Sequence, residues 1–390
     1  MRASGRYMAA SLAVVLAAAL LAGCSQEIRG EEDVLARPYT GHFYDDPPSA
    51  AGTPGTVVRS ELAAGGPQGA TAWRILFRST DQSGRAVLNS GMLVEPDGKA
   101  PAGGRTVVSW AHATTGSAEK CAPSRSVDPY VWMEGLTGLL KQGYAVVSTD
   151  YTGMGVAGPN SYLVGETEGR NVLDAARAAR AVLGAAASDR VLLWGHSQGG
   201  QAALFAAQAW KRYAPELEVR GVAVAAPATD LAPLLRADIG DVSGVSIASY
   251  AFDAYSSVYD APLDSILTPA AVAALPTMTG FCLLTQNRTL HDVAQPLVGR
   301  FLAGDPETTQ PWAELLAANT PGASALPMPL FVAQGLSDSL VRPSSTSAFV
   351  ALEKQRGTDV TYDPVAGATH GSIANKAMPA VLRFFDGVAR

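Results

Sequence analysis

One short stretch of the sequence carries residues whose types and spacing could perform nucleophilic chemistry. Residues 195–199 read Gly-His-Ser-Gln-Gly, a G-x-S-x-G pattern with Ser197 as the candidate nucleophile. The apolar run at 191–194 is typical of a strand buried on both faces of a parallel sheet, and the Ala-rich run at 201–210 favours a helix. A sharp turn between strand and helix would expose the serine hydroxyl. The five letters alone are weak evidence, because 39 of the 390 residues are glycine, and a serine that caps the helix is the alternative.

A serine hydroxyl needs a base to take its proton, and histidine is the usual one. The chain has five histidines, of which His42 lies near the N-terminus and His291 in a long insert. His196 adjoins the serine, where the backbone direction is expected to point its ring elsewhere. His370 lies in a glycine-flanked loop after the last predicted strand, residues 360–362, and such loops carry function in parallel sheets. We predict that His370 is the base.

The base in turn needs an acid that fixes its tautomer and stabilises the imidazolium. Asp338 follows the predicted strand at 330–333, again at the carboxyl edge of the sheet. Asp363 competes for the role, but it belongs to the last strand or its immediate end, which is too early. Ser197, Asp338 and His370 then follow the Ser…Asp…His chain order of α/β-hydrolases.

Two backbone amides are expected to form an oxyanion hole, which binds the negative oxygen of a tetrahedral intermediate. One is the amide of Gln198, directly after the nucleophile. The other should come from the loop after the predicted strand at 106–110. Thr114 and Thr115 are both candidates there, and the sequence does not choose between them. His112 is expected to brace this loop through a hydrogen bond.

The order of predicted elements indicates an α/β fold. Expected strands lie at 73–78 and 87–94, which form a hairpin, and at 106–110, 144–148, 191–194, 222–225, 330–333 and 360–362, with helices at 130–142, 172–183, 201–210, 345–354 and 378–388. Such alternation predicts a mostly parallel central sheet with helices on both faces, the α/β-hydrolase fold. Residues 231–326 break the pattern with apolar helical pieces, and we expect a helical cap, or lid, inserted over the mouth of the sheet.

The N-terminal segment is expected to be removed from the mature protein. Residues 1–23 combine a basic start with an apolar run too short to span a bilayer, which predicts a signal peptide. The run ends in Leu-Ala-Gly-Cys, which looks like a bacterial lipobox and implies lipidation of Cys24 and a membrane anchor. A secreted protein without lipid is the alternative. Residues 24–67 are expected to form a tether, and residues 68–390 the folded domain.

Composition and spacing exclude several classes of function. The chain is 47% apolar, enough for a sizeable core, and its net charge of −6 without a basic tract gives no support for nucleic-acid binding. Residues 153–158 fit G-x-G-x-x-G, but Pro159 follows instead of a helix, so no NAD site is expected. Metal-ligand spacings are missing as well, and no cofactor is expected. We expect a monomer whose partners are an ester or lipid substrate and a membrane.

Two cysteines remain after Cys24. Thiols beyond the cytoplasmic membrane tend to be oxidised, so the sequence favours a disulfide between Cys121 and Cys282. Two free, buried thiols are the alternative.

Several segments together resemble the secretory lipase family, the lipase A-like α/β-hydrolases of fungi and actinobacteria. They are residues 150–155, the turn at 195–200, residues 334–338 and the loop around His370. The resemblance extends over most of the mature chain. It implies a lid after Asp230 and a disulfide from Cys121 to that lid region, which fits a partner at Cys282. The loop at 112–115 resembles the bacterial members, whereas the fungal members differ there.

These residues predict a serine carboxylic-ester hydrolase, specifically a triacylglycerol lipase that releases fatty acids through an acyl-enzyme. An esterase of short or aromatic acyl groups, or an acyltransferase, could use the same triad. A non-catalytic lipoprotein that binds lipid in the cleft is the alternative from another class of protein. An intact triad argues against that alternative, since a binder has no need of all three groups in order.

Overall fold

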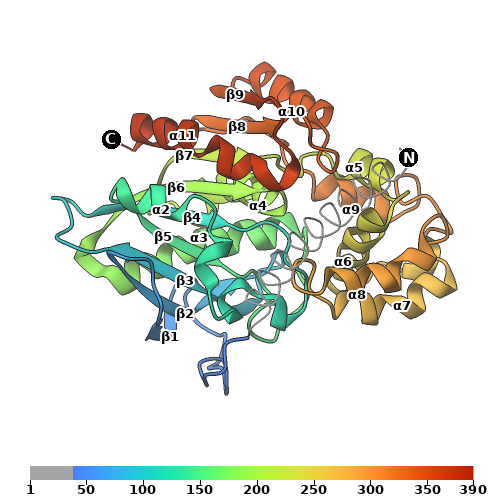
Figure 1. Ribbon diagram of the computed structural model, residues 1–390, viewed down its shortest axis with the longest axis horizontal. Coiled ribbons are helices and arrows are strands. Elements are labelled where there is room, and N and C mark those ends of the chain that lie inside the picture. Colours follow the sequence, from blue (N-terminus) through green and yellow to red (C-terminus); the bar gives the residue numbers. More distant parts are fainter. Residues whose placement is uncertain (1–37, 390) are drawn as a thin grey trace, which may run out of the picture.

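The fold is built on one nine-stranded sheet with the strand order β1-β2-β3-β5-β4-β6-β7-β8-β9 (Figure 1). The computed structural model describes residues 38–389. The strands are β1 (Val57–Leu62), β2 (Ala70–Thr80), β3 (Ala86–Pro96), β4 (Arg105–Ala111), β5 (Ala145–Thr149), β6 (Ala187–His196), β7 (Glu218–Ala225), β8 (Leu330–Gly335) and β9 (Val360–Val365). The strands from β1 to β3 pair antiparallel, as do β3 and β5, and all the remaining pairs are parallel. The mostly parallel sheet expected from the sequence is confirmed.

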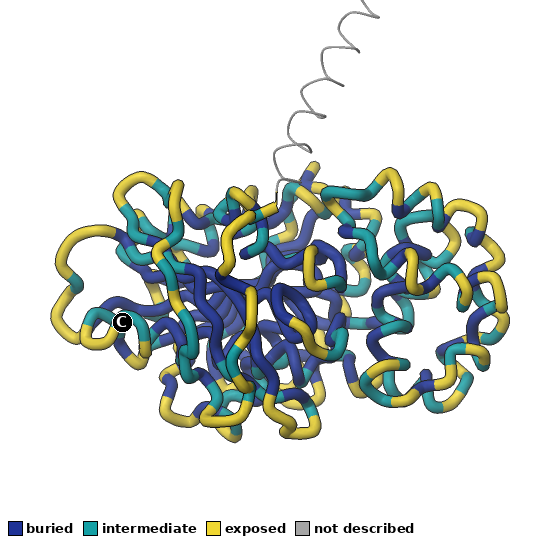
Figure 2. Tube along the Cα trace, turned by 90° about the horizontal axis from the view of Figure 1, so that it is seen from below, coloured by how far each residue is buried: buried dark blue, intermediate teal, exposed yellow. Residues whose placement is uncertain are grey.

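The central strands are apolar because helices cover them on both sides. Every residue of β4, β5 and β8 is buried, and so are the last six residues of β6. A strand with two buried faces needs a continuous run of apolar side chains, which is the pattern that marked these strands in the sequence. Figure 2 shows them as the dark blue centre of the molecule, surrounded by exposed loops.

Two layers of helices cover the sheet. One core cluster joins α3 (Gly165–Leu183), α4 (Gln198–Tyr213) and α10 (Pro343–Gln355) to one face. The other cluster joins α2 (Leu136–Lys141) and α11 (His370–Val388) to the opposite face, and it continues into the cap. α4 begins directly after the turn that ends β6, and α11 begins after a short loop that follows β9, so the first residues of both lie near the carboxyl edge of the sheet.

The segment between β7 and β8 forms the cap. Its helices are α5 (Leu231–Asp238), α6 (Val242–Tyr259), α7 (Pro269–Thr279), α8 (Asn287–Ala294) and α9 (Trp312–Ala318). They gather on one side of the sheet, at the right in Figure 1. Aromatic side chains hold this unit together, since the Phe252 ring packs edge-on against Trp312 at 5.2 Å between centroids. The helical insert expected at 231–326 matches this segment.

The helix expected at 130–142 is wrong as a single element. The chain forms a 3₁₀ turn at Pro129–Trp132 and then α2, with Gly135 between them. Gly135 has φ of 85°, a left-handed conformation that interrupts the helix. A Cβ at this position would lie 2.3 Å from the Met378 sulfur on α11, so only glycine fits there.

The tether expected at 24–67 is wrong over its second half. Residues 57–62 form β1, the edge strand of the sheet, and Phe43 and Tyr44 are buried against Leu76 of β2. Edge strands need little burial, and the neighbouring prolines and glycines hid this one in the sequence. The predicted signal peptide and Cys24 lie outside the described residues. Within residues 38–389, no helix is both long and apolar enough to span a bilayer.

Candidate active site

Ser197 occupies a strained turn between β6 and α4. Its φ of 55° and ψ of −118° are rare for an L-residue, and its side chain makes no capping hydrogen bond to α4. A Cβ on Gly195 would lie 2.1 Å from the carbonyl oxygen of Gly199, and a Cβ on Gly199 would lie 1.8 Å from that of Ala111. The two glycines therefore let strand, helix and the end of β4 meet at the turn. The serine hydroxyl is left free for another partner.

The structure brings together the three residues that the sequence singled out. The His370 ring lies between the other two, with Nε2 2.9 Å from the Ser197 hydroxyl and Nδ1 2.8 Å from Oδ2 of Asp338. The second oxygen of Asp338 accepts the amides of Leu340 and Val341, each at 2.9 Å. The carboxylate is thus fixed before it meets the imidazole. Asp363, the competing acid, lies inside β9.

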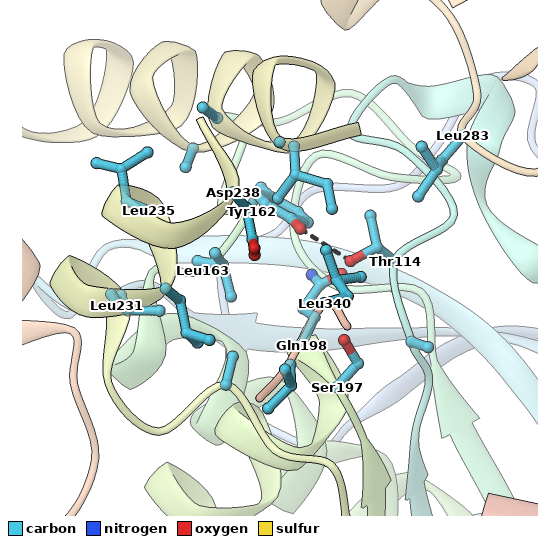
Figure 3. Close-up of a pocket in the computed structure, with 18 of the residues that line it drawn as sticks. Thr114, Tyr162, Leu163, Ser197, Gln198, Leu231, Leu235, Asp238, Leu283 and Leu340 are labelled. Atoms are coloured by element: carbon cyan, nitrogen blue, oxygen red, sulfur yellow. Dashed lines mark hydrogen bonds between the residues drawn. The ribbon is translucent and has the colours of Figure 1, made fainter. Parts of the chain in front are cut away.

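The two candidate threonines face different surroundings. Thr114 lines a cavity with Ser197, and its hydroxyl shares a 2.8 Å hydrogen bond with Tyr162, drawn in Figure 3. Thr115 instead donates its hydroxyl to the carbonyl of Cys121. Gln198 is the first residue of α4, so its amide has no acceptor within the helix.

The Gln198 side chain is held by a buried acid that sequence reasoning missed. Its amide nitrogen donates to Glu168 at 2.6 Å, and Glu168 also accepts the amide of Leu163 at 3.1 Å. Burial raises the pKa of the Glu168 carboxyl well above its usual range, which favours the neutral form. A neutral acid holds the start of α4 without placing a negative charge beneath it. The predicted helix began only at residue 172, so Glu168 gave no signal.

The histidines next to these elements have different surroundings. His112 is buried and donates from Nδ1 to the carbonyl of Ala113 at 2.7 Å, with its ring 4.5 Å from that of Tyr151. Burial lowers its pKa, so it stays neutral and braces the loop as expected. The expectation for His196 is wrong, because its ring lies 5.0 Å from the His370 ring and lines the cavity. It shares the face of β6 that α11 covers.

A cavity of about 470 Å³ lies between the sheet and the cap. Ser197, His370 and Thr114 line one end of it. The remaining wall is mostly apolar, and Figure 3 shows leucines from α5 and from the loops facing the same space as Ser197; they include Leu231, Leu235, Leu283 and Leu340. Asp238, at the end of α5, is the exception among these cap side chains. Clefts of about 300–1,000 Å³ bury most of a drug-sized ligand, so this one can enclose an extended apolar chain.

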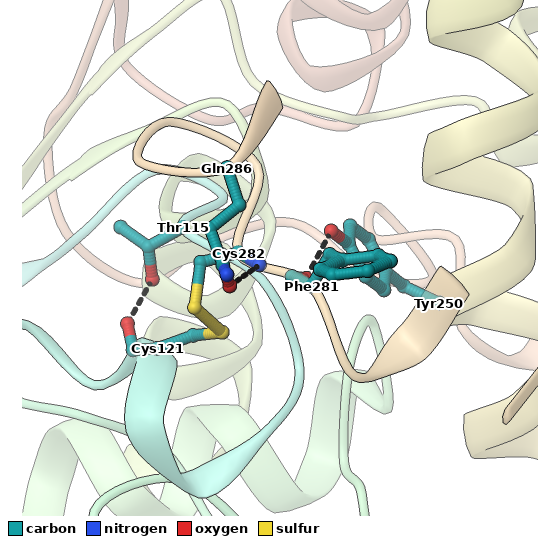
Figure 4. Close-up of a disulfide and its surroundings, with 6 residues drawn as sticks. All are labelled: Thr115, Cys121, Tyr250, Phe281, Cys282 and Gln286. Carbon is teal, nitrogen blue, oxygen red and sulfur yellow. Dashed lines mark hydrogen bonds between the residues drawn. A yellow bond between two sulfur atoms is a disulfide. The ribbon is translucent and has the colours of Figure 1, made fainter. Parts of the chain in front are cut away.

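A disulfide ties the threonine loop to the cap. The sulfurs of Cys121 and Cys282, the pair expected from the sequence, are joined 2.06 Å apart (Figure 4). The carbonyl of Thr115 accepts the amide of Leu283, and Gln286 accepts the amide of Cys282. The bridge closes a loop between cysteines that are 161 positions apart in the sequence. In the chain-entropy view such a loop stabilises the fold by about 5 kcal/mol.

Solved structures share this architecture. Candida antarctica lipase A in its closed state aligns with a TM-score of 0.73 and 22% identity, over 90% of this chain and 88% of that one. A ligand-bound form of the rice cell wall degrading esterase LipA from Xanthomonas oryzae aligns with a TM-score of 0.69 and 20% identity, over 87% of this chain and all of that one. The protein therefore has the α/β-hydrolase fold.

A family model described as secretory lipase matches residues 131–387, and the chain belongs to the secretory lipase family. Membership of this family places it among the serine ester hydrolases. Lipase A of Moesziomyces aphidis is 26% identical over 95% of this chain and 84% of that protein. A Mycobacterium tuberculosis (strain CDC 1551 / Oshkosh) protein named "Probable inactive lipase MT1628" is 27% identical over 85% and 77%.

Proposed function

We propose that the protein is a lipase that hydrolyses fatty acyl esters through an acyl-enzyme on Ser197. The observation that carries the proposal is the Ser197–His370–Asp338 chain of hydrogen bonds at one end of an apolar cavity. Since one relative is named inactive, family membership by itself does not decide whether a member turns over substrate. The hydrogen-bonded arrangement of the three residues supports turnover by this member of the family.

In the proposed reaction, each of the three side chains has the same role in acylation and in deacylation. The Ser197 oxygen attacks the ester carbonyl carbon while His370 Nε2 takes the hydroxyl proton. His370 then gives this proton to the leaving alcohol, and the acyl group stays on the serine. Water repeats the sequence and releases the fatty acid. Asp338 keeps the Nδ1 proton of His370 in place throughout and stabilises the imidazolium.

We assign the oxyanion hole to the amides of Gln198 and Thr114. Among the described residues, neither amide donates to another acceptor. Thr114 is preferred over Thr115 because Thr114 lines the cavity, whereas Thr115 contacts the disulfide region. Backbone donors held in advance at this point stabilise the tetrahedral intermediate without reorganisation.

Chain length is the direct test of the substrate class. We expect the wild-type protein to hydrolyse p-nitrophenyl esters from acetate to palmitate, with kcat/KM rising by about tenfold or more toward the long chains, because longer chains bury more apolar surface in the cavity. Cleavage of the acetate ester alone would instead make it a short-chain esterase with a selective cap. No turnover at any length would leave a lipid-binding lipoprotein as the better account.

Asp238 is a titratable cap residue in the mostly apolar wall of the cavity. It lies at the end of α5 and faces the same space as Ser197 (Figure 3). Burial raises its pKa to about 7; nearby Arg342 opposes this rise, while Asp241 and Asp338 add to it. The carboxyl is therefore neutral below about pH 7 and charged above it. A charged group in an apolar wall disfavours an acyl chain.

We predict that the KM for long-chain esters rises by about threefold to tenfold as the pH passes upward through the pKa of Asp238. Asp238→Asn keeps the side chain neutral and should remove this rise. The acetate ester, whose acyl group buries little apolar surface, should show no such dependence in either protein. Asp264→Asn, an exposed acid elsewhere in the cap, serves as the control. An unchanged pH dependence of KM in Asp238→Asn would contradict the assignment.

We also propose that the protein acts outside the cytoplasm as a monomer held to a membrane through lipid on Cys24. Its family is secretory, which agrees with an extracytoplasmic location. The lipobox-like sequence at 21–24 supports the anchor. A single chain already contains all three residues of the proposed triad and both proposed oxyanion amides.

A further inference from the structure

A second carboxylate–imidazole pair lies beside the first. His196 Nδ1 is 2.8 Å from an Oε atom of Glu134, and the His196 ring packs 5.0 Å from the His370 ring at an angle of 39°. His196 is 3% exposed. Two imidazoles therefore lie in contact, and each is hydrogen-bonded through Nδ1 to its own carboxylate.

Two tryptophans fix the position of Glu134. Trp194 and His196 are two residues apart on β6 and thus share one face of the sheet. The Trp194 indole donates to the backbone carbonyl of Glu134 at 2.9 Å, while His196 binds its carboxylate. The neighbouring Trp110 indole donates to the carbonyl of Trp132 at 2.8 Å. Both the backbone and the side chain of Glu134 are consequently held from β6.

The turn that contains Glu134 and Gly135 packs on α11, the helix that carries His370. Gly135 follows Glu134 and fits closely against Met378 of α11. His370 is the first residue of α11. The contact connects the Glu134 turn with the element that positions the base.

The hydrogen bonds favour a neutral His196. Its Nε2 is buried without a partner among the described residues. A protonated ring would leave an N–H donor there unsatisfied, which is costly. The neutral ring that donates from Nδ1 leaves only a lone pair in that position. Glu134 and His196 together then carry one negative charge.

We propose that Glu134 and His196 are positioning residues that support His370 and stabilise its imidazolium. The inference rests on the proposed function, because His370 becomes charged only when it takes the proton of Ser197. The His196 ring holds the face of the His370 ring, and the Glu134 carboxylate fixes the tautomer and orientation of His196. The negative charge of the pair adds to that of Asp338 at the moment the imidazolium forms.

Other charged and titratable groups lie next to His370, on its helix or on the wall of the same cavity. They are Asp338 at its Nδ1, Asp238, Tyr162 and Tyr255 on the cavity wall, Arg342 near Asp238, and Lys376 on α11, whose amine donates to the carbonyl of Gly367. Unlike these acids, Glu134 reaches His370 through another imidazole, that of His196. The substitution Glu134→Gln leaves all the other groups in place.

The test is the pH dependence with which a fluorophosphonate labels Ser197. Glu134→Gln keeps an oxygen that accepts from His196 but removes the charge. We expect its maximal labelling rate constant to fall by about threefold to tenfold, and the acidic limb of the profile to move about half to one pH unit lower, since the imidazolium is less favoured. Glu95→Gln, which removes an ion-paired carboxylate facing Arg105, should match the wild type.

The outcomes separate the possible explanations. A purely structural role would lower the yield of folded protein, but it would leave the acidic limb and the rate constant of the folded fraction in place, and this would overturn the inference. His196→Phe keeps a ring against His370 without the hydrogen bond. Because Glu134 and His196 act as one pair, the variant with both substitutions should lose less than the product of the two single losses; losses that multiply would also overturn it. Failure of the wild type to label would remove the proposed function and this inference together.

Discussion

Ser197→Ala is expected to lower kcat/KM for p-nitrophenyl esters by about 10⁵-fold or more. The substitution removes the atom that forms the acyl-enzyme, and the oxyanion amides alone give only a small residual rate. The Ser197 hydroxyl bonds only to His370 among the described residues, so the fold should survive its removal. Hydrolysis followed by product absorbance and labelling by a fluorophosphonate probe both report the loss.

Ser347→Ala is the matched control, because Ser347 is an exposed serine on α10, away from the cavity. It should retain wild-type activity, and both variants should melt within a few degrees of the wild type. A Ser197→Ala protein that still hydrolyses esters at more than about a hundredth of the wild-type rate would rule out the acyl-enzyme mechanism.

The fold was largely predictable because its central strands are buried on both faces. That burial demands continuous apolar runs, such as 191–194 and 222–225, which stand out in the sequence. The edge strand β1 faces solvent and mixes Arg59 and Glu61 with valines, so it carries no comparable pattern. Gly135 illustrates the other limit, since only its contact with Met378, more than 200 positions away, explains why a helix is interrupted there.

The three central side chains were predictable because each follows a strand, and parallel strands bring their carboxyl ends to one edge. Chain order then assigned a role to each. The proposed choice of Thr114 over Thr115 depends on which of two adjacent residues faces the cavity, and the sequence alone does not show that. Glu168 lies on a helix that the periodicity placed several residues too late.

The misjudged direction of the His196 ring has a specific cause. Residues on a strand alternate between faces, so His196 points away from the side on which α4 begins. The sequence alone therefore predicts a ring that lies away from the site. The face it does point to is covered by α11, and α11 begins with His370. Both observations can be made from the sequence, but only the folded structure shows that the His196 and His370 rings lie together.

Asp338→Asn is expected to lower kcat/KM by about 10³–10⁴-fold while the fold is retained. The reason lies in the hydrogen bonds around the carboxylate. One oxygen accepts two backbone amides, from Leu340 and Val341, and the other faces His370 and the side-chain amide of Gln334. An asparagine must therefore keep its oxygen on the backbone amides and turn its NH₂ toward His370.

That NH₂ group would meet His370 Nδ1 as a donor. The imidazole must then leave a lone pair on Nδ1 and carry its proton on Nε2, which faces the Ser197 hydroxyl. A protonated Nε2 cannot accept the serine proton, so the base is lost although every atom stays near its place. Asp363→Asn, which changes the competing acid inside β9, should remain within about threefold of the wild type. A loss below about tenfold in Asp338→Asn, or a larger loss in Asp363→Asn, would show that Asp338 does not orient the base.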